Sequence, residues 1–172
     1  ITDRFNGSIG LPVPSTDISI RDDDGNELNF EEPGELCIKG PQVMSGYWNN
    51  VSETKSSFTE DGFFKTGDIA TIDKKGFLKI VDRKKDMIIS SGFNVYPNEI
   101  EDYVSKHPDV LECGVIGVED SNRGEMIHLY IVKNSDSLTE NEIKIFCKKG
   151  LTVYKIPKKV IFIKEMPKNN VG

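Results

Sequence analysis

The feature that most constrains the fold is a change in the pattern of apolar residues at Asp82-Arg83. Before this point, apolar and polar residues alternate with a period of two, which is typical of half-buried β-strands. The alternation is clear in three runs, at residues 17–21, 35–39 and 77–81. Turn dipeptides separate the runs, at Asp24-Gly25, Pro33-Gly34, Asp61-Gly62 and Lys75-Gly76. Short strands with frequent glycine turns predict a small barrel-like or sandwich-like sheet for residues 1–82.

Residues 83–172 combine helical and strand patterns instead. Asn98 and Thr139 are each followed three residues later by a glutamate, which is the signature of a capping box at a helix N-terminus. Gly150 is predicted to cap the C-terminal end of the second helix. Three apolar runs predict strands, at residues 110–118, 126–132 and 159–164. The chain is therefore expected to be an α+β protein, with a β-barrel-like subdomain followed by a small α+β domain.

The charge of the chain changes at the same point as the pattern. Residues 1–82 carry 8 lysines and arginines against 15 aspartates and glutamates, whereas residues 83–172 carry 14 against 13. This step predicts a boundary between two domains, at residues 1–82 and 83–172. The net charge of −6 and the pI near 5.0 argue against a nucleic-acid partner.

The three cysteines predict a structural role and not a metal site. Cys37, Cys113 and Cys147 lie far apart and form no Cys-x-x-Cys pair, so we expect small buried apolar residues and no metal ligands. The first ten residues show no export signal, and no apolar run approaches the roughly 18 residues of a membrane helix. These observations favour a cytoplasmic protein with reduced thiols.

The best candidates for chemistry are Thr66-Gly67-Asp68 and Arg83. An ionised aspartate accepts hydrogen bonds through two oxygens, which suits the paired hydroxyls of a ribose. Gly67 would let a nucleotide approach the backbone closely. Arg83 offers a planar set of donors for ribose or phosphate oxygens. On spacing alone, a Thr-Gly-Asp is more often an ordinary turn capped by its own aspartate, and an arginine after a strand is usually a surface charge.

Several motifs together resemble the acyl-adenylate-forming (AMP-binding) superfamily, in order and at its spacing. They are Gly34-Glu35-Leu36-Cys37-Ile38-Lys39-Gly40, Ser45-Gly46-Tyr47-Trp48, Phe64-Lys65-Thr66-Gly67-Asp68, Asp82-Arg83-Lys84-Lys85-Asp86-Met87-Ile88-Ile89, Ser91-Gly92-Phe93-Asn94-Val95-Tyr96-Pro97 and Pro167-Lys168-Asn169-Asn170-Val171-Gly172. The resemblance covers essentially the whole chain. Within the superfamily, the run SGFNVYPNEIED is most similar to the bacterial long-chain fatty-acid–CoA ligases.

The resemblance implies a ligase that works in two half-reactions. ATP and a fatty acid give an acyl-adenylate and pyrophosphate, and the thiol of CoA then displaces AMP to give a thioester. ATP, Mg²⁺ and CoA are the implied cofactors and co-substrates, with the Mg²⁺ ligands upstream of this chain. Residues 83–172 are implied to be the mobile C-terminal domain, and residues 1–82 the last subdomain of the large N-terminal domain.

The resemblance also assigns roles to individual residues. Asp68 would accept both ribose hydroxyls of ATP or AMP, Arg83 would add a contact to the ribose, and Ile80 would lie near the adenine. Lys85 falls at the hinge about which the smaller domain rotates. Ser91, Gly92 and Phe93 would line the path of the CoA pantetheine.

Parts of the family pattern are absent from this chain. The phosphate loop and the magnesium-binding glutamate lie upstream in the family, and the catalytic lysine follows the motif that ends at Gly172. The chain also begins at Ile1 and not at a methionine. We therefore expect a fragment that is inactive by itself. Two alternatives remain open, namely another acyl-CoA ligase of the superfamily (aryl or medium-chain) and a non-catalytic binding module of the same fold.

A basic stretch near the C-terminus has three possible interpretations. Residues 144–168 contain eight lysines and a single acidic residue, Glu165. The lysines could attract the 3′-phosphate of CoA, could contact an anionic membrane surface peripherally, or could form a solvated surface.

Overall fold

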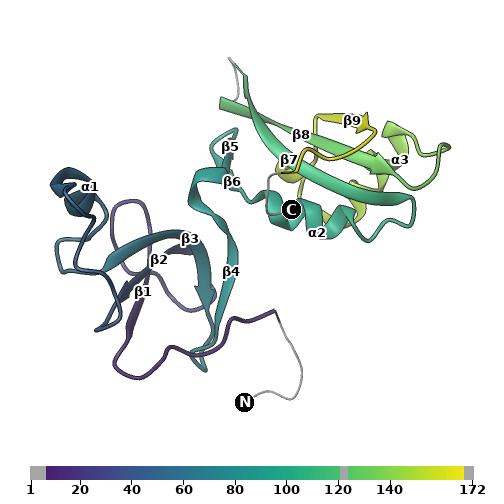
Figure 1. The fold of residues 1–172 in the computed structure, drawn as a ribbon. Helices are drawn as coiled ribbons and strands as arrows, with labels where there is room; N and C mark the ends of the chain where they lie inside the picture. The colour runs from purple at the N-terminus through teal and green to yellow at the C-terminus, as the bar shows by residue number, and fades with distance from the viewer. Residues whose placement is uncertain (1–6, 121–123, 169–172) are drawn as a thin grey trace. The chain divides into compact units, whose positions relative to one another are not determined.

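The computed structural model of the protein describes residues 7–120 and 124–168, and it has the α+β fold that the sequence predicts (Figure 1). The chain divides into two compact units, Ile1–Lys85 and Asp86–Gly172. A short 3₁₀ helix, η1 (Lys84–Asp86), contains the boundary between them. The first unit is dominated by strands, and the second combines strands with two longer helices.

The first unit is built on a four-stranded antiparallel sheet in which each strand pairs with the next along the chain. The strands are β1 (Asp17–Arg21), β2 (Gly34–Lys39), β3 (Phe64–Ile72) and β4 (Leu78–Arg83). Within the described residues β1 and β4 are the two edges, so the sheet is open and the expected barrel does not close. Four strands are too few to enclose a filled interior, for which about eight are usual.

Alternating residues of this sheet form its core. Ile20, Leu36, Ala70 and Leu78, one from each strand, pack together and are buried. A one-and-a-half-turn helix, α1 (Val51–Ser56), lies between β2 and β3 and buries none of its residues. The side chain of Asn50 caps this helix by accepting a hydrogen bond from the backbone N–H of Glu53 at 3.1 Å.

The second unit contains a five-stranded sheet and two helices. Its elements are β5 (Ile88–Ser90), β6 (Phe93–Val95), α2 (Pro97–Val104), β7 (Val110–Asp120), β8 (Gly124–Lys133), α3 (Glu140–Gly150), a 3₁₀ helix η2 (Val153–Lys155) and β9 (Lys159–Ile163). The strand order is β6-β5-β8-β7, and β9 pairs in parallel with β8. Apolar residues of both helices, among them Ile100 and Ile143, join those of β8, among them Leu129, in one buried core.

The predicted N-cap of the first helix, Asn98, is wrong, because the helix begins before it. Helix α2 begins at Pro97, and its N-cap is Tyr96, which makes no side-chain capping bond. Proline fits the first helical position because a backbone N–H at that position would have no hydrogen-bond acceptor within the helix. Asn98 therefore lies inside the first turn and does not cap it.

The second capping box is confirmed. The hydroxyl of Thr139 accepts a hydrogen bond from the N–H of Glu142, whose carboxylate in turn accepts one from the N–H of Thr139 at 2.8 Å. At the other end, Gly150 is the last helical residue and Leu151 is the C-cap, so the predicted cap is displaced by one position. Glycine is required here for packing, because a Cβ at this position would overlap the ring of Tyr103.

The Thr139 cap leads to a stability prediction. The substitution Thr139→Ala should lower the free energy of unfolding by about 1 kcal/mol, because the N–H of Glu142 loses its partner. Urea unfolding checks this value, with Thr152→Ala as the control. Thr152 occupies the same position before η2 but makes no side-chain capping bond. Equal losses in the two variants would contradict the cap.

Candidate nucleotide-binding site

Thr66-Gly67-Asp68 forms a bulge inside strand β3 and not a separate turn. Lys65 pairs with Cys37 and Ile69 pairs with Glu35, so three residues of β3 lie opposite the single residue Leu36. Gly67 has a φ of +73°, a conformation that residues other than glycine rarely adopt. The extra residues interrupt the alternation of β3, which is why the pattern of the sequence did not reveal this strand.

Hydrogen bonds from neighbouring residues hold the bulge in place. The hydroxyl of Thr66 donates to the carbonyl of Leu36 at 2.9 Å and accepts from the N–H of Asp68 at 3.1 Å. The N–H of Gly67 donates to Oε1 of Glu35 at 3.3 Å. The bulge thus has a defined shape, and it fixes the position from which the Asp68 side chain extends.

The structure brings Asp68 and Arg83 together. The two residues are direct partners across β3 and β4, and Nη1 of Arg83 lies 2.8 Å from Oδ1 of Asp68. The Asp68 side chain is 24% exposed and that of Arg83 is 60% exposed, so both remain open to a ligand. A carboxylate has about four acceptor positions, so Asp68 can accept further hydrogen bonds while it pairs with Arg83.

Ile80 lies on the same strand as Arg83 but contributes to the core. It pairs with Ala70 and packs, partly buried, against the apolar cluster of the first unit. A second bulge, between Ile69 and Ala70, separates this pair from the pair formed by Asp68 and Arg83. The predicted contact of Ile80 with adenine stays a prediction.

Glu35, which holds Gly67 of the bulge, also contacts Lys84, and sequence reasoning missed this contact. Nζ of Lys84 lies 2.8 Å from Oε2 of Glu35 and 2.8 Å from Oδ1 of Asp23. Burial lowers the pKa of Lys84, but the hydrogen bonds to Asp23 and Glu35 outweigh burial and raise the pKa above its ordinary value. Glu35 occupies a polar position of an alternating strand, which predicts a solvated side chain, so the sequence offers no signal for this contact. Lys85, the predicted hinge residue, follows Lys84 in η1, and its role stays a prediction.

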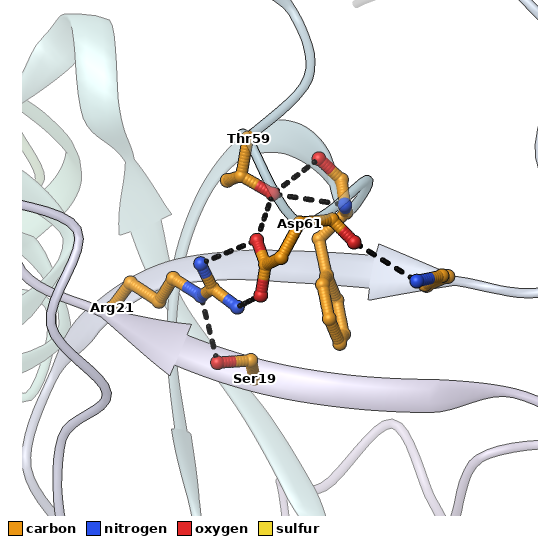
Figure 2. A network of polar contacts seen from close by, with 6 residues as sticks. Ser19, Arg21, Thr59 and Asp61 are labelled. Carbon is orange, nitrogen blue, oxygen red and sulfur yellow. Dashed lines mark hydrogen bonds and ion pairs between the residues drawn. The ribbon is translucent and has the colours of Figure 1, made fainter.

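A second polar network holds the loop that precedes β3 (Figure 2). The guanidinium of Arg21 binds both carboxylate oxygens of Asp61, at 3.0 and 2.6 Å, and Nε of Arg21 donates to Ser19. Thr59 donates to the same carboxylate at 2.7 Å. The hydrogen bonds from Arg21 and Thr59 hold the pKa of Asp61 well below its ordinary value. Sequence analysis had assigned Asp61 only to a turn.

The two networks line one pocket of the first unit. Arg21, Asp61, Glu35 and Lys84 are among the residues around a pocket of about 540 Å³. Cys37 also contributes to the lining but is itself buried, at 1% exposure.

Ser91 and Gly92 form the turn of a hairpin in the second unit. They connect β5 to β6 and have φ values of +53° and +82°. Two consecutive positive φ values are typical of a tight type I′ turn. The turn itself explains the glycine at position 92, and no described atom lies within 4 Å of where its Cβ would be.

Phe93 is 52% exposed and stacks on Tyr154, with ring centroids 4.5 Å apart. The predicted role of Ser91, Gly92 and Phe93 along the path of CoA stays a prediction.

The cysteines are placed as expected for structural residues. Cys37 and Cys147 are buried and Cys113 is partly buried, and all three are free thiols. Burial raises the pKa of Cys113 and of Cys147 to about 11. Their thiolates are therefore scarce at neutral pH, so these thiols are poor nucleophiles. The described residues contain no group of three or more His, Cys, Asp or Glu side chains arranged to hold a metal ion.

The lysines of residues 144–168 are partly paired within the unit. Lys144 lies close to Glu140, Lys155 to Glu99 and Lys168 to Glu112. These ion pairs reduce the charge that the stretch can offer to CoA or to a membrane surface, and they favour the interpretation as a solvated surface.

Among the residues that the structure describes, no helix is long and apolar enough to cross a membrane. Residues 169–172, which end the last family motif, lie outside the described residues.

Comparison with known families assigns the chain to a class of enzymes. The family described as AMP-binding enzyme C-terminal domain matches residues 99–172, and the family described as AMP-binding enzyme matches residues 2–48. Together these matches cover more than half of the chain, in the order that the sequence motifs predict. The chain belongs to the AMP-binding enzymes.

Two of the relatives that the chain matches are acyl-CoA ligases. The chain is 56% identical over 169 residues to the long-chain-fatty-acid--CoA ligase of Yersinia pestis, in a match that covers 98% of this chain and 30% of the relative. It is 44% identical over 163 residues to the mitochondrial medium-chain acyl-CoA ligase ACSF2 of Rattus norvegicus, covering 94% of this chain and 26% of that protein. The chain thus spans about 30% of the length of the bacterial relatives it matches.

A solved structure shares the fold. MatB from Rhodopseudomonas palustris with ATP bound matches with a TM-score of 0.92 at 39% identity, over 99% of this chain and 34% of that chain. Apo MatB matches over the same shares and at the same identity, but with a TM-score of 0.71. The part of MatB that corresponds to this chain is therefore arranged differently in the two structures of that protein.

Proposed function

We propose that this chain is the C-terminal part of an ATP-dependent long-chain fatty-acid–CoA ligase. In the first half-reaction the carboxylate of the fatty acid attacks the α-phosphate of ATP, and pyrophosphate leaves. In the second, the thiol of CoA attacks the acyl carbon, and AMP leaves. The observation that carries the proposal is the ion pair between Asp68 and Arg83 at the bulge of β3, together with the identity to ligases over almost the whole chain.

In this proposal the bulge binds the ribose of the nucleotide. Asp68 accepts hydrogen bonds from the two ribose hydroxyls, and Arg83 donates to the ribose while it orients the carboxylate. Gly67 adopts a positive φ and has no side chain, so the backbone here leaves room for the ligand to approach closely. Ile80 is proposed to contact the adenine with the exposed part of its side chain.

The second unit is proposed to move between the half-reactions about Lys85. Two observations support a pivot here. The division into compact units falls directly after Lys85, and the corresponding part of MatB differs between its ATP-bound and apo structures. Once the unit has moved, Ser91, Gly92 and Phe93 are proposed to line the path along which the thiol of CoA reaches the adenylate.

The remaining machinery is proposed to lie in the rest of a longer protein. The chain corresponds to about 30% of the bacterial relatives, so the phosphate loop, the Mg²⁺ ligands and most of the fatty-acyl pocket are assigned to the other 70%. The catalytic lysine of the family is also assigned to a position outside residues 1–172. It would stabilise the charge that develops at the α-phosphate, an electrostatic contribution that is often the largest single one in such reactions.

A comparison of the full-length protein with this chain tests the proposal. We expect the full-length protein to form acyl-CoA from ATP, CoA and a long-chain fatty acid, and residues 1–172 alone to form none. Carboxylates of increasing length, together with an aryl acid, identify the preferred substrate. Preference for a medium-chain acid would favour the activity named in the rat relative, and a full-length protein inactive with every acid would favour a binding module.

A further inference from the structure

The carboxylate of Glu35 connects two parts of the first unit, namely the bulge that is proposed to bind the ribose and the residue before the proposed pivot. Its Oε1 accepts the N–H of Gly67, in the bulge that presents Asp68, at 3.3 Å. Its Oε2 accepts from Nζ of Lys84, the residue immediately before the proposed pivot, at 2.8 Å. The pair formed by Asp68 and Arg83 makes a second connection between the same two segments.

The environment of Glu35 makes this connection stronger than a surface ion pair. The Glu35 side chain is 11% exposed, and that of Lys84 is 34% exposed. Charges that are largely removed from water interact more strongly and are screened less by salt than exposed charges. Asp23, the other carboxylate beside Lys84, is 70% exposed and should contribute little.

We propose that Glu35 is a positioning residue that ties the ribose-binding bulge to the fixed side of the pivot. This inference rests on the proposed function, since it concerns the coupling of its two half-reactions. By holding Lys84 against the sheet, Glu35 keeps residue 84 with the first unit and confines rotation to Lys85 and the residues after it. By holding Gly67, the same carboxylate sets the bulge that receives the nucleotide.

Selective substitutions separate the two contacts. In Glu35→Gln, the amide oxygen can still accept from Gly67, but the neutral side chain no longer pairs with the charge of Lys84. Lys84→Met removes the same ion pair from the other side and keeps the aliphatic stem. Asp23→Asn is the matched control, because it neutralises the exposed partner of Lys84 and leaves Glu35 in place.

The experiment uses the full-length ligase and measures each half-reaction separately. ATP–pyrophosphate exchange reports adenylation and gives the KM for ATP. Single-turnover reaction of the preformed adenylate with CoA reports thioester formation. In Glu35→Gln and in Lys84→Met we expect thioester formation to slow by about tenfold, the effect of losing one charged hydrogen bond. Exchange and the KM for ATP should stay within about twofold, as should both half-reactions in Asp23→Asn.

The double variant Glu35→Gln/Lys84→Met completes the test. If the two residues act as one pair, the double variant should be no slower in thioester formation than either single variant. Equal loss in both half-reactions would indicate a merely structural role, and additive losses would indicate two independent roles; either result overturns the inference. An unmodified full-length protein that forms no acyl-CoA would overturn the proposed function, and this inference with it. An active enzyme that is indifferent to Glu35→Gln would overturn this inference alone.

Discussion

Replacing Asp68 by alanine in the full-length ligase is expected to raise the KM for ATP by about tenfold or more for each hydrogen bond lost. A hydrogen bond to a charged group contributes roughly 1.5–3 kcal/mol, and 1.4 kcal/mol corresponds to a factor of ten in affinity. The substitution also leaves Arg83 without the carboxylate that holds it at 2.8 Å. The guanidinium is then free to turn toward solvent, which adds to the loss. Initial rates of pyrophosphate exchange over a range of ATP concentrations give the effect.

Two companion variants show whether the effect comes from the ribose contact. Arg83→Ala should give a smaller loss, because its side chain is 60% exposed and interactions of exposed charges are weak. Asp17→Ala removes an exposed carboxylate at the start of β1, on the same sheet, and should leave the KM for ATP unchanged. An unchanged KM for ATP and an unchanged turnover in Asp68→Ala would rule out the ribose role.

The strands of the first unit could be predicted wherever one face of the sheet is buried. Burial of Ile20, Leu36 and Leu78 imposes a period of two, and each of these residues lies in or beside a predicted run. Strand β3 was not predicted, because its bulge places Gly67 and Asp68 where a regular strand would continue the alternation of apolar and polar residues. Closure of the sheet could not be read from periodicity, since every strand of an open meander alternates in the same way.

The helix ends show how local chemistry decides between competing signals. At α3, Thr139 and Glu142 each accept a hydrogen bond from the other's backbone N–H, as their spacing predicts. At α2, proline at position 97 fixes its own φ near the helical value and so begins the helix before Asn98. The helix itself was predicted correctly, but Asn98 was wrongly predicted as its N-cap.

The candidate site was predictable only in part, because its contacts join distant segments. Asp68 and Arg83 were identified together from the resemblance of their motifs, and the register of β3 and β4 makes them partners. No motif linked Glu35 to Lys84, since their contact depends on the path of the chain after β4 ends. Arg21 and Asp61 likewise meet across 40 positions of sequence.

Replacing Lys85 by proline in the full-length ligase should separate the two half-reactions. Proline fixes its own φ near −65° and disfavours helical geometry in the residue before it, which here is Lys84 in η1. A pivot that must change its backbone angles is then held in one state, and a penalty of about 3 kcal/mol corresponds to more than about a hundredfold in rate. We expect this loss in thioester formation from the preformed adenylate, whereas pyrophosphate exchange should be retained.

Two control variants distinguish a stiffened pivot from other causes. Lys85→Ala removes the side chain but leaves φ free, so both half-reactions should continue if rotation is what matters. Lys74→Pro introduces proline at an exposed turn between β3 and β4, where the N–H of Gly76 donates to the carbonyl of Asp73 at 2.9 Å. Lys74 is the second residue of that turn, a position that favours proline, so this variant should keep both activities. Equal losses of both half-reactions in Lys85→Pro would mean that the substitution damages the fold or the nucleotide site, and the pivot would have to be sought elsewhere in the chain.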